Sequence, residues 1–498
     1  MIRRTTLEEL LEKAASGAAS VVTHSGRVTP GGIFVLMPAS VPRGGEEDAP
    51  GGEQWLEAAL KNKPAYVLCH PRHIPLLESL HAECAVAPSL AVRRDLGQLA
   101  RAMHHTNTAC PKVVGITGTN GKTTESYLLE AMLRNLGMAV GVIGTVSYRW
   151  PGHEEDAPLT TPGCLELHSM LARMAAANAQ YAFMEVSSHA LDQERVAGID
   201  FSAALLTNVT QDHLDYHKDM DDYFQAKARL FLPEDRGGVP FDGKKRVANV
   251  DDAMGRRLLE MTPGGLGFGL TGVRAASSRH LAGEILSLSP QGLRLRMSYE
   301  GRNWELASPL VGVFNAMNLL GAQALGLELG LEPEQFAALA SFAGVSGRLE
   351  RVPNKHGLNV FVDYAHTPDA LAKAISALRD AGFARIITVF GCGGNRDRKK
   401  RPLMGQAVAA LTDVAVLTSD NPRDEDPEAI MADVLPGLAL CPEVVSLADR
   451  RAALAKSLEL LGKNDALLVA GKGHERYQLV KGVKHPFSDQ DILRELMQ

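Results

Sequence analysis

The sequence predicts an α/β protein built from largely parallel sheets, and two observations support that class. Short apolar runs alternate with helical patterns from residue 112 onward, as in sheets that helices cover on both faces. A chain of 498 residues also exceeds one ordinary core, and domain sizes indicate about three units. We expect an N-terminal domain at residues 1–95, a central domain at 96–345 and a C-terminal domain at 346–498.

The N-terminal part is expected to be a small α/β module, with short strands at residues 33–37 and 65–69. The opening stretch MIRRTTLEELLEKAASG is typical of an amphipathic helix rather than a secretion signal. The chain contains no apolar run long enough to span a bilayer, so no membrane insertion is expected. We therefore expect a cytoplasmic protein.

Composition excludes several classes of protein. A content of 45% hydrophobic and 22% charged residues is typical of a globular enzyme, and the net charge of -6 argues against general affinity for nucleic acid. The cysteines lack CxxC spacing, so neither a disulfide framework nor a zinc site is indicated. Reduced, mostly buried thiols are expected at Cys69, Cys84, Cys110, Cys164, Cys392 and Cys441.

The most informative stretch is KVVGITGTNGKTT at residues 112–124, which joins a strand to a glycine-rich turn and then to a helix. Such a turn holds phosphates with its backbone N–H groups and the positive end of the helix dipole. Lys122 would reach the outer phosphates, and the Thr123 hydroxyl would lie on a magnesium ion. The spacing departs from the standard P-loop, but a plain glycine turn would leave the lysine and the paired threonines unexplained.

Polar clusters follow other strands, at the sheet edge where open α/β folds bind ligands. EVSSH follows the strand expected at residues 181–184, and TN with a later DH follows the one at 203–206. Glu185 and His213 could complete a magnesium shell with Thr123. Histidine suits softer metals better, and a strand-end histidine is more often structural, so both interpretations of His213 stay open.

The third unit has expected strands at residues 359–362, 385–390, 414–418 and 466–470. The last three precede GCGGNRDRKKR, SDNPRDED and GKGHE. The basic stretch at residues 395–401 follows a strand and a glycine turn, which favours carboxylate or phosphate recognition over a solvated face. Arg423 could present its planar fork to a carboxylate, although an ordinary Asn-Pro turn with an exposed arginine fits equally well.

Together these segments closely resemble the Mur ligases over nearly the whole chain. The resemblance depends on the order of motifs more than on any single one. In that order they are GTNGKTT, TTP, MEVSSHAL, TNVTQDHLDYH, FQAKARLF, GVFNAMN, SGRLERV, VDYAHTPDAL, FGCGGNRDRKKRPLMG, DNPR and GKGHE.

The resemblance implies three domains: a small N-terminal α/β domain for the UDP end of the substrate, a central P-loop ATPase domain and a C-terminal Rossmann-like domain for the incoming amino acid. It also implies ATP-dependent ligation of meso-diaminopimelate to UDP-N-acetylmuramoyl-L-alanyl-D-glutamate through an acyl phosphate, in peptidoglycan precursor synthesis. Mg²⁺ is the expected cofactor, and a monomer is expected. A lysine-adding Mur ligase and a folylpolyglutamate synthase are rival enzymes that DNPR and GKGHE disfavour. A nucleotide-binding regulatory module is the rival outside enzymes.

The family's site residues carry over by motif. For ATP they are Gly118, Thr119, Asn120, Gly121, Lys122, Thr123, Thr124, Asn318, Arg348 and Asp363. For magnesium they are Thr123, Glu185, His213 and Lys227, where Lys227 matches a lysine that the family carbamylates with carbon dioxide. From the residues alone, Lys227 would be a surface helix lysine. Catalytic roles fall on Lys122, Lys227 and His213.

Two further sets of residues match the family's substrate contacts. Contacts to the UDP-muramoyl dipeptide match Ser25, Thr160, Thr161, Ser187, Gln193 and Arg195. The diaminopimelate pocket matches Arg396, Asp420, Asn421, Pro422, Arg423, Gly471 and Glu475. The sequence departs from the family at His24 and Gly26, which replace Asp and Arg, and at Leu159, where some relatives carry Asn. These departures affect the UDP-muramoyl contacts and leave the ATP and amino-acid motifs intact.

Overall fold

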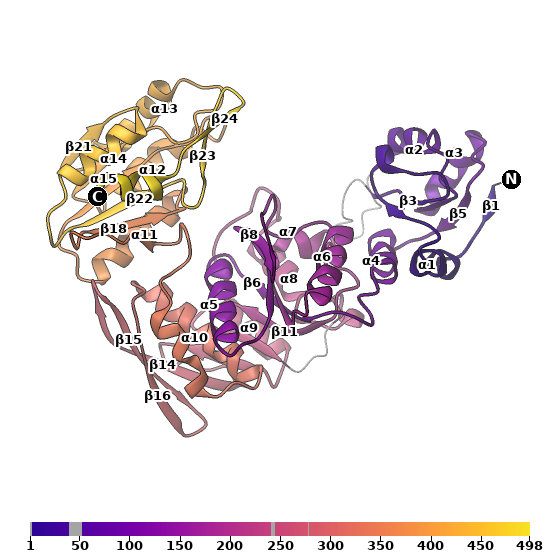
Figure 1. The fold of residues 1–498 in the computed structure, drawn as a ribbon, viewed down its shortest axis with the longest axis horizontal. Coiled ribbons are helices and arrows are strands. Elements are labelled where there is room, and N and C mark those ends of the chain that lie inside the picture. Colours follow the sequence, from indigo (N-terminus) through magenta and orange to yellow (C-terminus); the bar gives the residue numbers. More distant parts are fainter. Residues whose placement is uncertain (1, 39–51, 241–244, 277) are drawn as a thin grey trace. The chain divides into compact units, whose positions relative to one another are not determined.

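Figure 1 shows the computed structural model, which describes residues 2–38, 52–240, 245–276 and 278–498. The chain divides into two compact units. The first unit comprises Met1–Gly269, Val273–His280 and Gly321–Glu332, and the second comprises Leu270–Gly272, Leu281–Leu320 and Pro333–Gln498. Each unit consists of sheets covered by helices, so the predicted α/β class is confirmed. The domain boundaries expected at residues 95 and 345 stay a prediction.

The first unit begins with a five-stranded parallel sheet in the order β1-β5-β4-β3-β2. Its strands are β1 (Arg3–Arg4), β2 (Val21–Val22), β3 (Ile33–Val35), β4 (Tyr66–Cys69) and β5 (Ala85–Pro88). Its helices are α1 (Leu7–Ala15), α2 (Glu53–Leu60), α3 (Ile74–Ser79) and α4 (Val92–Met103). The expected N-terminal helix is present, and Thr6 caps it by accepting a hydrogen bond from the Glu9 N–H.

The larger sheet of the first unit runs β13-β12-β11-β6-β10-β7-β8-β9, and its first six strands are parallel. These strands are β6 (Lys112–Thr117), β7 (Val140–Ile143), β8 (Ser147–Trp150), β9 (His153–Asp156), β10 (Tyr181–Glu185), β11 (Phe201–Leu206), β12 (Arg246–Asn249) and β13 (Leu266–Gly269). The helices are α5 (Lys122–Asn135), α6 (Cys164–Ala176), α7 (Ser188–Asp192), α8 (Met220–Ala228) and α9 (Ala253–Met261). Central β6 therefore ends beside the ends of β10 and β11.

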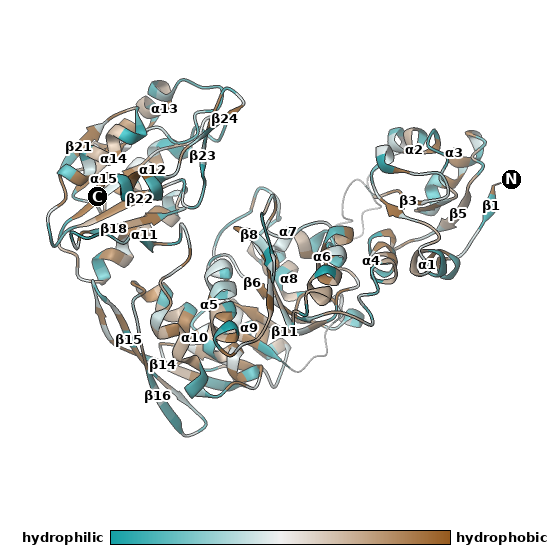
Figure 2. Cartoon of the chain, viewed as in Figure 1, coloured by the Kyte–Doolittle hydropathy of each residue, from teal (hydrophilic) through white to brown (hydrophobic). Residues whose placement is uncertain are grey.

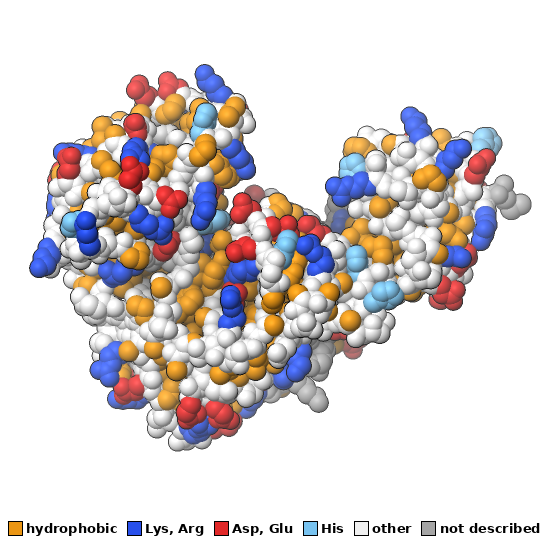
Figure 3. All heavy atoms as spheres, in the orientation of Figure 1, with side chains coloured by type: hydrophobic (Ala, Val, Ile, Leu, Met, Phe, Trp, Pro, Cys, Tyr) orange, Lys and Arg blue, Asp and Glu red, His pale blue; other side chains and the backbone are white. Residues whose placement is uncertain are grey.

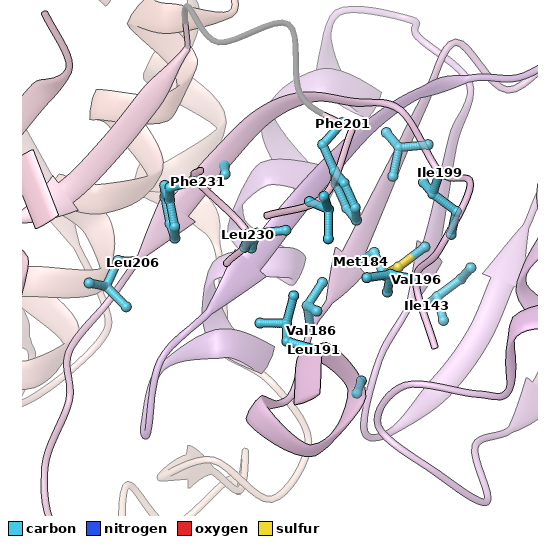
Figure 4. Close-up of a cluster of buried hydrophobic side chains, with 14 of the residues drawn as sticks. Ile143, Met184, Val186, Leu191, Val196, Ile199, Phe201, Leu206, Leu230 and Phe231 are labelled. Carbon is cyan, nitrogen blue, oxygen red and sulfur yellow. The ribbon is translucent and has the colours of Figure 1, made fainter. Parts of the chain in front are cut away.

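Apolar side chains from these strands and helices form one buried core. Figure 4 shows Met184 and Val186 from the β10 region, Phe201 and Leu206 from β11, and Leu230 after α8 among its members. All five are at most 1% exposed. This packing fixes the ends of β6, β10 and β11, from which the loops of the candidate site emerge.

The second unit contains an antiparallel set of β14 (Arg279–Ser289, from residue 281 on), β15 (Gly292–Tyr299) and β16 (Arg302–Ser308), followed by residues 313–320 of α10 (Val313–Glu328). Its main sheet runs β17-β18-β22-β19-β20-β21, parallel except for β17. The strands are β17 (Glu350–Arg351), β18 (Asn359–Asp363), β19 (Ile386–Phe390), β20 (Val414–Leu417), β21 (Glu443–Ser446) and β22 (Ala466–Ala470). Helices α11 (Pro368–Asp380), α12 (Lys400–Ala409), α13 (Pro427–Val434), α14 (Arg450–Glu459) and α15 (Asp489–Leu496) accompany a hairpin of β23 (Tyr477–Val480) and β24 (Val483–Pro486).

The parallel arrangement expected from residue 112 onward has antiparallel additions in two places. Strands β7, β8 and β9 pair antiparallel, and so do β14, β15 and β16. Only two residues separate β8 from β9, β14 from β15 and β15 from β16. A two-residue connection can join antiparallel strands but is far too short for a parallel crossover. Gly152 and Gly301, with φ near +79°, supply the left-handed backbone for two of these turns.

Hydropathy and charge follow the layers of the fold. In Figure 2 the central strands are mostly hydrophobic, whereas outward helix surfaces carry hydrophilic residues. On the face seen in Figure 3, basic and acidic side chains are mixed over the surface of both units. Within the described part of the chain, none of the helices combines the length and apolar character that a membrane span requires. All six cysteines are free, and four of them are buried, as expected.

Candidate functional site

The loop between β6 and α5 has a shape that glycine alone permits. Gly118 has φ +148° and Gly121 has φ +90°, both in the region that side chains disfavour. A Cβ at Gly118 would lie 1.9 Å from Thr207 Oγ1, which is closer than any real contact. The predicted strand, turn and helix are thus confirmed in position, including Gly137 with φ +75° at the helix end.

A second loop, after β11, holds the glycine-rich turn in place. The Thr119 N–H donates to Asn208 O at 2.9 Å, and the Asn120 N–H donates to Asn208 Oδ1 at 3.0 Å. In return, Thr207 Oγ1 donates to Asn120 O at 2.6 Å. The N–H groups of Thr119 and Asn120 are therefore already bonded to the backbone and side-chain oxygens of Asn208. The opening turn of α5 keeps the N–H groups that have no partner within a helix.

Two lysines converge on one carbonyl of this turn. Lys122 Nζ donates to Gly118 O at 2.9 Å and to Thr119 O at 3.1 Å, while Lys227 Nζ donates to Gly118 O at 3.0 Å. Lys227 is 2% exposed and lies 4.5 Å from the centre of the Tyr223 ring. Burial, followed by the charge of Lys122, lowers the pKa of Lys227 well below its ordinary value.

The position of Lys227 corrects the interpretation drawn from the residues alone. It lies on a helix, α8, as expected, but its side chain is buried rather than exposed. The reason is that α8 is short and packs most of its surface inward, with Phe224, Ala226 and Ala228 also buried. The sequence of α8 lacks a clear polar face, and this feature could have indicated that the helix is largely buried.

Glu185, at the end of β10, lies directly against the start of α5. Its Oε2 accepts hydrogen bonds from Thr123 Oγ1 at 3.0 Å and Thr145 Oγ1 at 2.8 Å, and its Oε1 accepts one from the Thr145 N–H at 3.0 Å. The carboxylate is 1% exposed. Sequence analysis missed Thr145, although its place after Gly144 at the end of β7 put it at the same sheet edge.

His213 lies in the loop after β11 with φ +52°. Its N–H donates to Asp212 Oδ1 at 2.9 Å, and its Nε2 is 3.6 Å from Asp212 Oδ2. Its ring meets that of His189 edge-on, with 4.8 Å between ring centres. Partial burial lowers the pKa of His213, and Lys227 and Lys122 lower it further against the opposite effect of Asp212. The structure thus joins Thr123 to Glu185 directly but pairs His213 with Asp212.

The oxygen donors at this edge suit a hard cation. Among the residues that the structure describes, no three His, Cys, Asp or Glu side chains form a metal site by themselves. The Thr123 hydroxyl and the Glu185 carboxylate are hard ligands 3.0 Å apart. Mg²⁺ is typically held by one or two carboxylates together with phosphate oxygens and waters, so this donor set fits it.

Four residues expected to contact the UDP-muramoyl dipeptide form one hydrogen-bonded chain, and a fifth lies beside Thr145. The Thr161 hydroxyl donates to Glu185 O at 2.8 Å and accepts from the Ser187 N–H at 3.1 Å. Arg195 donates to Thr161 O at 3.0 Å and to Gln193 Oε1 at 2.7 and 3.0 Å. Thr160 Oγ1 lies 3.1 Å from Thr145 Oγ1. The chain thus ends on the backbone carbonyl of Glu185, and Thr160 reaches the Glu185 carboxylate through Thr145.

A cavity of about 710 Å³ opens beside Gln193 and Arg195. Its lining also includes Arg27 and Arg93, so it presents several cationic side chains. Ser25 is buried in the neighbouring turn Ser25–Arg27 and is not part of the lining. His24 lines the cavity and caps that turn, because its Nδ1 accepts from the Gly26 N–H at 3.1 Å. A histidine here performs the capping that an aspartate could perform.

In the second unit, a polar network joins the loops after β20 and β22. Asn421 Nδ2 donates to Glu475 Oε2 at 2.8 Å, and Lys472 Nζ donates to Asn421 Oδ1 at 3.2 Å and to Glu475 Oε2 at 3.1 Å. Lys472 is fully buried and was not among the predicted site residues. A Cβ at Gly471, where φ is +111°, would lie 2.5 Å from Asp420 Oδ2. The structure therefore brings Asp420, Asn421, Gly471 and Glu475 together.

Arg423 is held in a left-handed conformation by the hairpin of β23 and β24. Its φ is +53°, its N–H donates to Leu479 O at 3.0 Å, and its carbonyl accepts from the Lys481 N–H at 2.7 Å. Its guanidinium donates to Gly394 O at 2.7 Å. The hairpin was not predicted, because its two-residue turn, Lys481 and Gly482, lacks the Asn or Asp that usually precedes glycine in such turns.

The basic stretch at residues 395–401 serves the fold more than was expected. Arg401 is buried and pairs with Glu425 and Asp433, both at 2.8 Å. Arg398 pairs with Asp433 at 2.9 Å. Arg396 is exposed. The ligand-binding interpretation of the stretch is therefore wrong for Arg398 and Arg401, whose carboxylate partners belong to this chain.

Three residues expected to contact the nucleotide also lie in the second unit. Asn318, on α10, is 7% exposed and its Nδ2 donates to Asn315 Oδ1 at 3.3 Å. Asp363, at the end of β18, accepts from the N–H groups of Leu349 at 2.6 Å and Ala365 at 2.8 Å. Burial raises the pKa of Asp363, while Arg348 acts in the opposite direction. Arg348 and Asp363 are therefore neighbours.

Comparison with known proteins identifies the family. Family models described as "Mur ligase middle domain" and "Mur ligase, glutamate ligase domain" match residues 116–326 and 347–473. A UDP-N-acetylmuramoyl-L-alanyl-D-glutamate–2,6-diaminopimelate ligase from Lawsonia intracellularis is 52% identical, with 96% of this chain and 95% of that protein covered. A ligase of the same name from Synechococcus elongatus is 41% identical, with 95% and 92% covered. A solved structure with that name has a TM-score of 0.68 at 31% identity and covers 96% of this chain and 94% of its own. The chain belongs to the Mur ligase family.

Proposed function

We propose that this chain joins meso-diaminopimelate to UDP-N-acetylmuramoyl-L-alanyl-D-glutamate at the expense of ATP, in peptidoglycan precursor synthesis. Two relatives, 52% and 41% identical over nearly their full length, carry the name of this ligase. The observation that carries the chemistry is the contact of Thr123 with Glu185, beside two lysines on the Gly118 carbonyl. That arrangement suits transfer of a phosphoryl group between two anions.

The reaction needs an activated acyl group, because a carboxylate does not react with an amine in water. The glutamyl carboxylate attacks the γ-phosphorus of ATP, the bond to the β-phosphate oxygen breaks, and ADP leaves. Lys122 moves from its loop carbonyls to the outer phosphates and stabilises the charge on the group in transfer. When bound, Mg²⁺ neutralises further phosphate charge, and Thr123, Glu185, His213 and carbamylated Lys227 are the residues that would hold it.

Carbamylation of Lys227 is part of this proposal. A neutral amine adds to carbon dioxide and loses a proton, which converts a cation into an anionic oxygen ligand. The burial of Lys227 and the nearby charge of Lys122 favour the neutral amine, since both lower the pKa of Lys227. The carbamate also removes the repulsion between two ammonium groups that share the Gly118 carbonyl.

The amino group of diaminopimelate then attacks the acyl phosphate, and the tetrahedral species releases phosphate to leave the amide. Arg423 pairs with the carboxylate that diaminopimelate has and lysine lacks. Asp420, Asn421 and Glu475 offer oxygen acceptors for an ammonium group, with Arg396, Pro422 and Gly471 completing the pocket. A site with such a polar contact rejects the analogue that lacks it, by about 10⁴-fold in favourable cases.

The cavity of the first unit receives the UDP end of the substrate. Its lining includes Arg27, Arg93 and Arg195, whose guanidinium groups suit a diphosphate, together with the carboxylates of Glu166 and Glu194. The chain of Thr160, Thr161, Ser187, Gln193 and Arg195 then leads from this cavity to Glu185, so the muramoyl dipeptide would extend toward the phosphate loop. Ser25 contributes through its turn rather than as a lining residue. The protein is expected to act as a cytoplasmic monomer.

An amino-acid panel tests the proposal. ADP formation is measured with the UDP-muramoyl dipeptide and either meso-diaminopimelate, lysine, glutamate or no amino acid. Turnover that needs both the dipeptide and meso-diaminopimelate supports the proposal. Turnover with lysine would indicate a lysine-adding ligase. In a separate arm, a folate replaces the dipeptide, and turnover with glutamate there would indicate a folylpolyglutamate synthase. ATP hydrolysis that ignores both acceptors would indicate a nucleotide-dependent regulatory module.

A further inference from the structure

We propose that Arg401 is a positioning residue for the amino-acid site. Through Glu425 it fixes the loop at residues 391–395, and that loop in turn fixes the guanidinium of Arg423. The inference rests on the proposed function, because it explains what orients the arginine that would bind the second carboxylate of diaminopimelate. Neither Arg401 nor Glu425 is among the site residues that carry over from the family's motifs.

Arg401 is buried at the start of α12 and is shared by two carboxylates. It is 1% exposed, its Nη2 donates to Glu425 Oε1 at 2.8 Å, and its Nη1 donates to Asp433 Oδ2 at 2.8 Å. Glu425 follows β20 in the same loop as Arg423, whereas Asp433 lies on α13. The same guanidinium therefore connects the loop of the amino-acid site with a helix outside it.

Glu425 has a second partner that Asp433 lacks. Its Oε1 also accepts a hydrogen bond from the backbone N–H of Asn395. Asn395 has φ +51°, and its Nδ2 donates to Asp424 Oδ2 at 2.8 Å. The carboxylate that anchors Arg401 thus also fixes an unfavourable backbone conformation at the end of the glycine turn.

The glycine turn in turn contacts the arginine of the site. The Gly394 N–H donates to Asn421 O at 2.9 Å, and a Cβ at Gly394 would lie 1.9 Å from Pro422 O. Gly394 O accepts the hydrogen bond from Arg423 Nη1 at 2.7 Å. Any displacement of residues 394 and 395 therefore moves the acceptor that orients the Arg423 guanidinium.

The two carboxylates of Arg401 supply a matched test. Glu425→Gln and Asp433→Asn each remove one charge from the same guanidinium, but only Glu425 contacts the glycine turn. We expect Glu425→Gln to raise the KM for diaminopimelate about tenfold or more, because small misplacements of binding groups have large kinetic effects. The KM for ATP should not change. Asp433→Asn should change the KM for diaminopimelate less than about threefold by the same argument.

Thermal unfolding of both variants separates positioning from stability. A role in stability alone predicts similar losses of Tm and similar kinetics for the two variants. Equal KM increases, or no increase with Glu425→Gln, would overturn the proposal. Arg401→Met should raise the same KM at least as much as Glu425→Gln does, if it folds. A wild-type protein that joins another amino acid would contradict the proposed function, and the two variants would still test the positioning role with that amino acid.

Discussion

The two units build their loops from different kinds of contact. In the first unit, the glycine-rich turn is held by uncharged hydrogen bonds from Thr207 and Asn208, and its lysines rest on a backbone carbonyl. In the second unit, the loops after β19, β20 and β22 are held by ion pairs whose cations are buried, such as that of Arg401 with the partly exposed Glu425. The difference fits the proposed ligands. A polyphosphate binds lysine side chains that can leave the backbone carbonyl they contact. A zwitterionic amino acid instead binds among side chains whose charges are already paired within the protein.

Lys122→Ala gives the largest expected effect, because it removes the ammonium group that would contact the phosphoryl group during its transfer. We expect ligation to fall by at least about 10³-fold, as for other groups that stabilise charge in phosphoryl transfer. The fold should persist, since the neighbouring turn is held by Asn208 and Thr207. Initial rates of ADP formation and a circular dichroism spectrum measure the two effects. Lys112→Ala, at the exposed start of β6, is the control, and near-normal turnover of the Lys122 variant would refute its assigned role.

The second unit should lose stability when its deepest ion pair is broken. Arg450 and Asp489 are fully buried, and Arg450 also donates to Ala470 O, directly before the loop that carries Gly471. Asp489→Asn leaves a buried guanidinium unpaired, which should cost about 3–5 kcal/mol of unfolding free energy. Urea denaturation measures this change.

The same two helices supply a control for that prediction. Arg451 and Glu495 also join α14 to α15, but their side chains are 47% and 59% exposed. Glu495→Gln should cost much less unfolding free energy than Asp489→Asn, because water and salt screen an exposed ion pair. Equal losses from the Asp489 and Glu495 variants would show that burial does not distinguish these pairs.

How far the sequence predicts each site depends on how local the site is. The phosphate loop is contiguous, so residues 112–124 were enough to predict its strand, turn and helix. Thr145 was not predicted, because it contacts Glu185 only when β7 and β10 pair. The burial of Lys227 likewise depends on packing across the sheet.

The proposed amino-acid site is assembled from segments far apart in the chain. Glu425, Arg401 and the β23–β24 hairpin fix Arg423, and no local pattern indicates which cation of a basic stretch will be buried. The predicted members Asp420, Asn421 and Glu475 were found from motifs, whereas Lys472 between them was not assigned. The sequence therefore does not predict the ion pairs that join distant residues of this site.

Arg423→Ala should reduce kcat/KM for diaminopimelate by about 10²-fold, since truncating one partner of a charge pair typically costs a few kcal/mol. The KM for ATP should stay the same, and the preference for diaminopimelate over lysine should shrink. Steady-state kinetics with both amino acids measure the change. Arg398→Ala, which loses only an exposed pair with Asp433, is the control. Unchanged use of diaminopimelate by the Arg423 variant would contradict the assigned contact.

Acidification should affect the two units at different pH values. In the first unit, His168 is buried between Thr106 and Ala197, and burial lowers its pKa to about 4. Above pH 6.5 the folded and unfolded forms are both neutral, so the stability is complete. Below pH 6.5 the unfolded chain binds a proton that the folded form refuses, and the loss should reach about 2 kcal/mol by pH 5.

In the second unit, the pKa of Glu425 is lowered to about 2, chiefly by its hydrogen bond from Arg401. Its contribution is complete above the unfolded pKa near 4.5 and is lost only as the pH falls toward 2. Hydrogen exchange at pH 7 and pH 5 should therefore show β10 and β11 losing protection before the loops around Glu425 do. His168→Gln should reduce the acid sensitivity of the first unit, and the part that remains should come from His189, whose pKa burial also lowers to about 4. Simultaneous loss of protection in both units would show that neutral and charged scaffolds respond to acid alike, and the contrast between them would then lie in ligand binding alone.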